Sequence, residues 1–135
     1  MDLDAALGYL ATHSHAVLVT RRADGGLQSS PVLATVDAQG RAVVSTRTGS
    51  AKERNLTRDP RAALCVFPDG FYGPWVHVDG DAEVVRLPDA LPLLEDYYRR
   101  VAGEHADWAD YRRAMVAEDR VLVRIVLEHA AGVTG

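Results

Sequence analysis

Short apolar segments that alternate with tight turns run through the first half of this chain, and they constrain its fold more than any other feature. The turn Asp24-Gly25-Gly26 separates the β-type segments 15–20 and 27–36, and the turn 37–40 separates the second of these from 41–46. Asp-Gly pairs supply the left-handed backbone that two-stranded hairpins need. Because parallel neighbours need long crossovers, these short connections predict an antiparallel sheet.

Three more segments have the alternating apolar pattern of strands: 61–67, a long strand at 75–86 that we expect to bend at Gly80, and 120–128. Short helices are predicted at 3–12, 51–58, about 88–102 and 108–117. The chain is therefore predicted to be mainly β with short helices (α+β). A closed or nearly closed barrel hides strand edges, so we expect residues 1–135 to form one domain, a small antiparallel β-barrel of about six strands. Pro31 cannot donate a ladder hydrogen bond and predicts an edge or a bulge.

Charge and cysteine content narrow the classes of function. The formal net charge of −4 does not favour a nucleic-acid binder, and no apolar run is long enough to cross a membrane. The one cysteine, Cys65, can form no internal disulfide, which favours the cytoplasm. Its apolar neighbours predict that it is a buried small hydrophobe. The five histidines lack metal-ligand spacing, so no metal site is predicted.

The segment from Ser45 to Arg61 is the best candidate for ligand chemistry. Ser50 and Glu53 form a capping-box pattern, which predicts that a helix begins at residue 51. The first turn of that helix carries Lys52 and Arg54, where cations oppose the helix dipole. Free N–H groups and nearby hydroxyls make such a helix start suitable for a phosphate. The alternative is an ordinary surface helix whose basic residues pair with Glu53 and Asp59.

Four motifs give the chain a resemblance to a known family. They are QSSPV at 28–32, VVST at 43–46, SAKERNL at 50–56 and DPRAA at 59–63. In combination they resemble the pyridoxamine 5'-phosphate oxidase-like split barrels, which implies that the six-stranded antiparallel barrel is a split β-barrel of the FMN-binding type. Residues 98–112 further resemble the actinobacterial branch of flavin/deazaflavin oxidoreductases that depends on coenzyme F-420.

The resemblance implies a homodimer with the cofactor in a groove between the chains. The strand at 28–32 would back the tricyclic ring, the hydroxyls and Lys52 would receive the phosphate, and Trp75 would pack beside the cofactor. His105 and Trp108 would close the groove. The cofactor-binding residues implied are Gln28, Ser29, Ser30, Pro31, Val32, Ser45, Thr46, Ser50, Ala51, Lys52, Arg54, Asn55 and Trp75.

The chain departs from true pyridoxamine phosphate oxidases, because Ala51 replaces a basic residue and their C-terminal arginine-histidine element is not recognisable. We therefore expect an F-420-dependent reductase that transfers a hydride to an electron-poor small-molecule acceptor. Alternatives are an FMN enzyme of the same fold, a non-catalytic F-420 carrier, and an interaction protein whose basic helix docks an acidic partner. No side chain is assigned a catalytic role.

Overall fold

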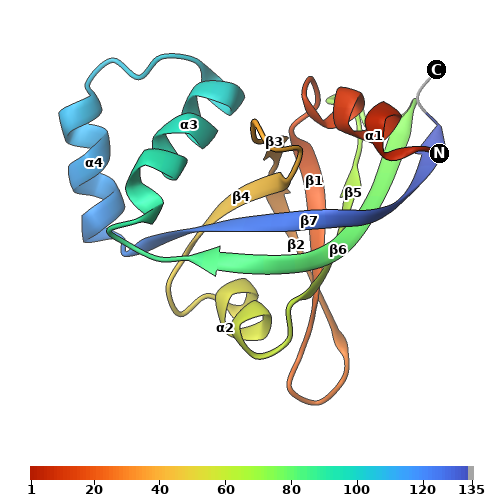
Figure 1. Cartoon of the computed structure of the whole chain (residues 1–135), viewed down its shortest axis with the longest axis horizontal. Coiled ribbons are helices and arrows are strands. Elements are labelled where there is room, and N and C mark those ends of the chain that lie inside the picture. Colours follow the sequence, from red (N-terminus) through yellow and green to blue (C-terminus); the bar gives the residue numbers. More distant parts are fainter. Residues whose placement is uncertain (134–135) are drawn as a thin grey trace.

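The protein is mainly β, as expected, and its computed structural model describes residues 1–133 (Figure 1). Within those residues there are four helices and seven strands. The helices are α1 (Leu3–Leu10), α2 (Ala51–Arg58), α3 (Ala90–Ala102) and α4 (Trp108–Ala117). The strands are β1 (His15–Arg21), β2 (Leu27–Leu33), β3 (Thr35–Val36), β4 (Ala42–Arg47), β5 (Arg61–Val66), β6 (Trp75–Val85) and β7 (Arg120–Val133). None of these helices has the length and apolarity needed to span a membrane.

All strands belong to one antiparallel sheet in the order β2-β1-β5-β6-β7-β4-β3. The two end strands, β2 and β3, follow each other in the chain with only Ala34 between them. The sheet therefore curls until one run of chain reaches both of its edges. The long strands β6 and β7 form the curved side, with the α3–α4 pair near one end and α1 near the other (Figure 1).

The strand count is the first correction to the sequence prediction. The segment 27–36 was expected to be one strand, which gave six, but it changes neighbours at Ala34. Its first part pairs with β1 and its last two residues pair with β4. Ala34 is fully buried and donates its N–H to the carbonyl of Ser14 at 2.8 Å. Closing the sheet requires one strand to leave one neighbour for another, and no residue pattern marks the point of exchange.

The last strand is also longer than predicted, because residues 129–133 continue the ladder as far as a pair between Val133 and Trp75. Small side chains allow this close pairing: a Cβ on Gly132 would overlap the backbone of Trp75. The predicted bend at Gly80 is confirmed, since the β6–β7 register shifts between Asp79 and Gly80. Such bulges bend and twist a strand, which here lets the sheet close.

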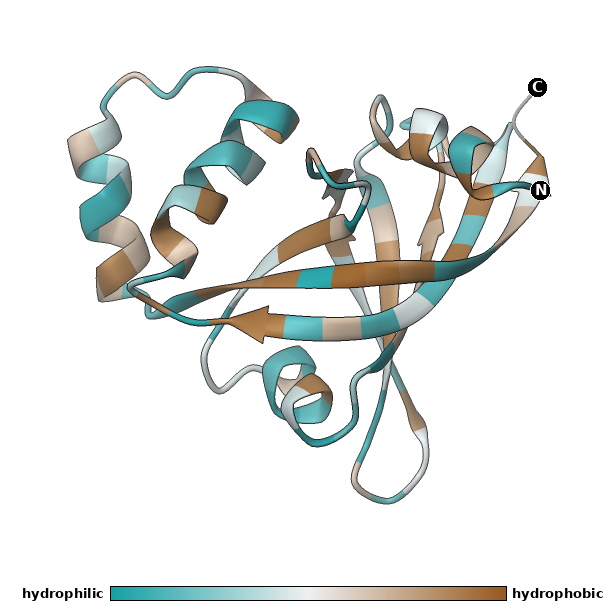
Figure 2. Ribbon diagram, in the orientation of Figure 1, coloured by the Kyte–Doolittle hydropathy of each residue, from teal (hydrophilic) through white to brown (hydrophobic). Residues whose placement is uncertain are grey.

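The main core lies inside the curled sheet. Leu18, Leu64, Val78 and Ile125 are almost fully buried there. Figure 2 shows apolar residues alternating along the long strands and a largely hydrophilic α2. The same alternation corrects the prediction for Cys65, which is exposed rather than buried. Side chains of a strand alternate between faces, so the inward positions on either side of it turn its thiol outward.

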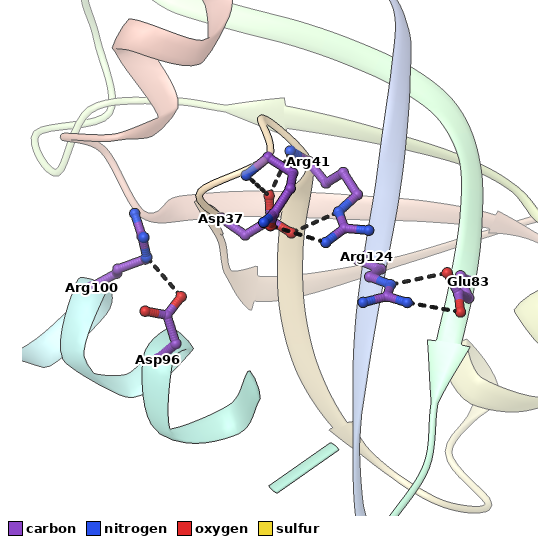
Figure 3. A network of polar contacts seen from close by, with 7 residues as sticks. Asp37, Arg41, Glu83, Asp96, Arg100 and Arg124 are labelled. Carbon is purple, nitrogen blue, oxygen red and sulfur yellow. Dashed lines mark hydrogen bonds and ion pairs between the residues drawn. The ribbon is translucent and has the colours of Figure 1, made fainter. Parts of the chain in front are cut away.

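A second apolar cluster holds α3 and α4 against the outer face of β4 and β7, with Val43, Leu94, Tyr111 and Leu122 at its centre. Beside it lie three ion pairs, one between two strands, one in the turn before β4 and one on α3 (Figure 3). Arg124 on β7 donates two hydrogen bonds of 2.9 Å to Glu83 on β6 and holds the pKa of that carboxyl below its usual range. Arg41 bonds Asp37 at 2.8 Å within the turn before β4. The Arg124–Glu83 pair joins β7 to β6, and the Arg41–Asp37 pair holds the turn between β3 and β4.

Candidate functional site

The start of α2 has the capped geometry that the sequence predicted. Ser50 has extended backbone, and its hydroxyl accepts the N–H of Glu53 at 3.2 Å. The return bond of the capping box is displaced by one residue, because the Glu53 carboxylate accepts the N–H of Gly49 at 3.4 Å. Gly49 has a φ of 88°, a left-handed conformation that suits glycine, and it turns the chain from β4 into the helix.

Two hydroxyls meet directly before this helix. The Oγ1 of Thr46, at the end of β4, lies 2.9 Å from the Oγ of Ser50. Thr46 is buried and faces the interior of the sheet, whereas Ser45 faces the side on which α3 packs. The sequence prediction grouped both residues with Ser50, and the structure brings Thr46 into contact with it.

The basic side chains of α2 differ from the others in the described part of the chain because they form no ion pairs there. Among the residues that the structure describes, Lys52, Arg54 and Arg58 have no carboxylate within ion-pair distance, whereas every other arginine of the chain has one. Arg54 donates to the carbonyl of Gly49, and Arg58 donates to the carbonyl of Arg21 at 2.6 Å. The positive charges of α2 are therefore held by neutral groups or left in solvent.

The nearby acids are already engaged with other residues. Glu53 pairs with Arg86 at 3.2 Å, and Asp59 pairs with Arg21 at 3.6 Å. The alternative of an ordinary surface helix with internally paired charges required these two acids as partners for the cations of α2. That pairing is not present in the part of the chain that the structure describes, so the basic side chains of α2 lack an internal carboxylate partner there.

Asn55 is placed differently from the other predicted site residues. It is buried, its Nδ2 donates to the hydroxyl of Thr20 at 3.1 Å, and its Oδ1 accepts from Arg58 at 3.1 Å. These bonds fasten α2 to β1. In this chain the Asn55 side chain is used for packing and does not point toward the helix start.

The predicted ring-backing strand is β2, whose residues alternate between the two faces. Gln28, Ser30 and Val32 face inward, and Ser29 and Pro31 face outward. The Oγ of Ser30 is buried and has no hydrogen-bond partner among the described residues. Leaving a buried hydroxyl unpaired costs about 1–3 kcal/mol. β2 ends the sheet, and Pro31 lies on this edge strand as its missing N–H predicted.

Trp75 is not brought to this site within one chain. It begins β6 and pairs with Val133, whereas the chain following α2 reaches β6 through a bond from the N–H of Ala82 to Pro60. Trp75 and Ala82 are seven strand residues apart, roughly 23 Å. A second chain would have to supply Trp75 if it contacts the same cofactor. It is 43% exposed.

His105 and Trp108 pack between α3 and α4 and do not line the entrance of a groove. Their rings pack against Tyr98 and Tyr111, and Arg99 lies over the Trp108 ring at 4.3 Å. These contacts join α3 to α4. Nothing in them opens toward α2.

Two residues near the site were not singled out from the sequence. Arg86, which directly follows β6, reaches α2 through Glu53 and through the hydroxyl of Thr57 at 3.1 Å. Tyr97, on α3, reaches β2, where its hydroxyl donates to the carbonyl of Leu33 at 2.7 Å. Each of these side chains bonds a residue more than 25 positions away in the sequence, and no local motif predicts such long-range contacts.

Two hollows lie on the outer face of the sheet. One of about 410 Å³ has Val19, Arg61, Cys65 and His77 in its lining. The other, of about 370 Å³, is lined by residues of β1 and β2 together with Phe67. On this outer face apolar side chains such as Val19 and Phe67 lie beside the polar ones of Arg61 and His77.

Comparison with known proteins agrees with this architecture. The sequence profile of the pyridoxamine 5'-phosphate oxidase family matches residues 3–134. A conserved hypothetical protein from Mycobacterium tuberculosis has 24% identity and a TM-score of 0.78, over 98% of this chain and 84% of that one. An F-420 reductase has 21% identity and a TM-score of 0.70, over 92% and 94%.

The same fold recurs in proteins of more distant sequence. General stress protein 26 from Bacillus anthracis has 13% identity and a TM-score of 0.70, over 97% of this chain and 92% of that one. At these identities the structures establish the shared fold, and the family match covers nearly the whole chain. The chain is therefore a member of the pyridoxamine 5'-phosphate oxidase family.

Proposed function

We propose that this protein is an oxidoreductase that binds coenzyme F-420 at the start of α2 and reduces an electron-poor small molecule. The observation that carries the proposal is the unpaired charge of α2: Lys52, Arg54 and Arg58 have no carboxylate partner among the described residues, and the acids beside them are engaged elsewhere. A similar fold in an F-420 reductase supports the choice of cofactor.

The chemistry of the donors fits the phosphate of such a cofactor. Charge-assisted bonds from Lys52, backbone N–H groups of the first helical turn and the Ser50 hydroxyl are all suited to anionic oxygen. Ser30 adds a hydroxyl that is buried and unpaired. A bound polar group would satisfy it, which gives a physical reason for its presence on β2.

The positions of these residues suggest which role the cofactor and which role each part of the chain would have. Coenzyme F-420 supplies a hydride from C5 of its reduced deazaflavin ring when bound. Lys52, Ser50 and Thr46 anchor the phosphate, and the β2 edge orients the ring and excludes water from one face. We assign no side chain as acid or base, and solvent delivers the proton that completes the reduction.

A second copy of the chain completes the groove in this proposal. Leu33, Trp75 and Val133 are large apolar residues of the sheet with 43–54% of their surface exposed. A homodimer that covers this face removes apolar surface from water, and it brings the partner's Trp75 to a site that its own chain cannot reach.

The decisive experiment is a pair of titrations of the purified protein, one with F-420 and one with FMN. Binding of F-420 at micromolar affinity or tighter, with FMN much weaker, is the expected result. The reverse order would identify an FMN protein of the same fold. If neither binds, the proposed function is wrong.

Replacing Lys52 with alanine tests the anchor. A charge-assisted hydrogen bond contributes about 1.5–3 kcal/mol, so we expect Lys52→Ala to weaken F-420 binding roughly tenfold to a hundredfold, with little change in Tm. Arg113→Ala is the matched control, because it removes one positive charge from an exposed ion pair with Asp110. Equal affinities of the two variants would rule out Lys52 as the anchor.

Turnover separates an enzyme from a carrier. Reduced F-420 bound to the protein is mixed with acceptors that contain electron-poor double bonds, and its absorbance is followed. Oxidation faster than that of free reduced F-420 is expected. If the cofactor binds tightly and no acceptor accelerates its oxidation, a carrier is the better description.

A further inference from the structure

Cys65 lies on the outer face of the sheet with a histidine directly opposite. The β5–β6 register pairs Cys65 with His77, and both side chains line the hollow of about 410 Å³. Opposite residues of an antiparallel pair point to the same face, with Cβ atoms about 4.5–5.5 Å apart. The thiol and the imidazole are therefore neighbours in one hollow. Free cysteine is among the most buried residue types, so the exposed thiol of Cys65 needs an explanation.

A carboxylate holds the imidazole of His77 in one orientation. The Nε2 of His77 lies 2.7 Å from Oδ2 of Asp79, two residues further along β6. A carboxylate accepts hydrogen bonds, so this contact assigns the proton of the neutral ring to Nε2 and leaves Nδ1 as the acceptor. Arg61 binds the other oxygen of Asp79 and fixes the carboxylate in turn. A thiol beside a base that a third group orients is the arrangement of an activated cysteine nucleophile.

The lining of the hollow indicates what kind of molecule it would accept. Val19, Leu27 and Ala63 give it apolar walls, and its two arginines are already paired with carboxylates. Its volume is in the range of small-molecule sites, about 300–1,000 Å³. Apolar walls and paired charges favour an uncharged molecule with an apolar body.

The hollow adjoins the residues that the proposed dimer would cover. Trp75 and Val133 form a register pair two residues before His77 on β6, and neither of them lines the hollow. From Cys65 the hollow extends the other way along the strands, toward Arg61. A dimer contact centred on Trp75 therefore leaves the hollow at its margin.

We propose that Cys65 is a nucleophilic thiol that adds to uncharged, electron-poor alkenes bound in this hollow. In the step, Nδ1 of His77 takes the thiol proton, and Sγ forms a bond to one carbon of the double bond. The π electrons move to the neighbouring carbon, which then takes the proton from Nδ1. The addition needs no oxidant, reductant or cofactor, so it is independent of the hydride transfer proposed above.

The test is the reaction of the purified protein with N-phenylmaleimide, an uncharged electron-poor alkene. Cys65 is the only cysteine, so a gain of one reagent mass reports its thiol. We expect the rate to saturate with reagent concentration, because the reagent occupies the hollow before the bond forms. At mildly acidic pH it should exceed the rate of glutathione at least about tenfold, a modest share of what a positioned base contributes.

Two histidine variants show whether the base matters. His77→Gln keeps a polar side chain and removes the base, so the saturated rate should fall at least about tenfold. His129→Gln is the matched control, because its ring lies 6.0 Å from that of His77 and does not line the hollow. It should react like the parent, and the Tm of both variants checks that they fold.

A saturating rate that is lost in His77→Gln and kept in His129→Gln would support the proposal. A rate that stays linear in reagent and equals that of glutathione would identify an ordinary exposed thiol and overturn it, as would a thiol that the dimer shields from reagent. The parent alone gives a second measurement, with a maleimide that carries a carboxylate. This charged reagent should show no saturation, and equal saturation by both reagents would refute the preference for an uncharged ligand.

Discussion

At the scale of single residues, the site combines charges without partners and one hydroxyl without a partner. Lys52 and Arg54 were predicted from their unfavourable position in the first turn of a helix, and no carboxylate of the described residues forms an ion pair with them. Ser30 is the complementary case on β2. An unpaired buried group lowers the stability of the free protein, and a ligand that pairs with it recovers that loss.

Replacing Ser30 with alanine measures this cost. In the cofactor-free protein we expect Ser30→Ala to leave the free energy of unfolding unchanged or to raise it by about 1 kcal/mol, because an unpaired hydroxyl is removed. Thr20→Val is the control, since it strips a partner from the buried amide of Asn55 and should cost about 1–3 kcal/mol. Urea unfolding of both variants makes the comparison.

The same variants respond differently to cofactor. A saturating ligand raises the unfolding free energy according to its affinity. If Ser30 contacts the cofactor, this gain is smaller in Ser30→Ala than in the parent. A marked loss of stability in cofactor-free Ser30→Ala would instead mean that the hydroxyl is paired in the native protein.

At the scale of elements, local sequence signals gave the helices and strands, and long-range geometry decided the rest. The cap of α2 and the bend at Gly80 were predictable, because turn and cap chemistry act within a few residues. The exchange of neighbours at Ala34 was not, because it depends on where β4 lies after the sheet has curled. Tyr97 and Leu33 are 64 positions apart in the sequence, so local patterns could not predict their hydrogen bond.

Gly80 tests whether the bulge is needed. A Cβ there would overlap the carbonyl of Val126, so we expect Gly80→Ala to lower the free energy of unfolding by several kcal/mol, beyond the typical range of about 0.5–3 kcal/mol for single mutations. Gly8→Ala in α1 is the control: no atom lies within 4 Å of its added Cβ, and it should gain about 0.5–1 kcal/mol. Thermal unfolding reports both, and a harmless Gly80→Ala would show that the register adapts.

At the scale of the whole molecule, the outer face of the sheet exposes several large apolar residues beside its charged ones. Leu27, Leu33 and Trp75 stand exposed on strands whose other side is already core. Their exposure was not predictable from alternation alone, because the sequence pattern of a strand is the same whether an apolar residue faces the core or a partner chain. The proposed homodimer gives these residues a common role.

Leu33→Asp tests the dimer. A charge at the centre of a buried interface costs several kcal/mol, so we expect the variant to elute as a monomer of 14.7 kDa while the parent elutes at twice that mass. Val116→Asp changes an exposed valine on α4, outside the sheet, and should leave the dimer intact. Light scattering after size exclusion gives both masses, and a monomeric parent would refute the two-chain groove.

The place of β7 in the sheet has a consequence for how the protein is made. Among the described residues it is the last strand in chain order, yet it lies between β6 and β4 and joins one half of the sheet to the other. Until residues 120–133 leave the ribosome, β3 and β4 have no neighbour that links them to the rest. We expect the sheet to remain in two incomplete halves until β7 has been synthesised. During that time the exposed apolar strands would be binding sites for chaperones.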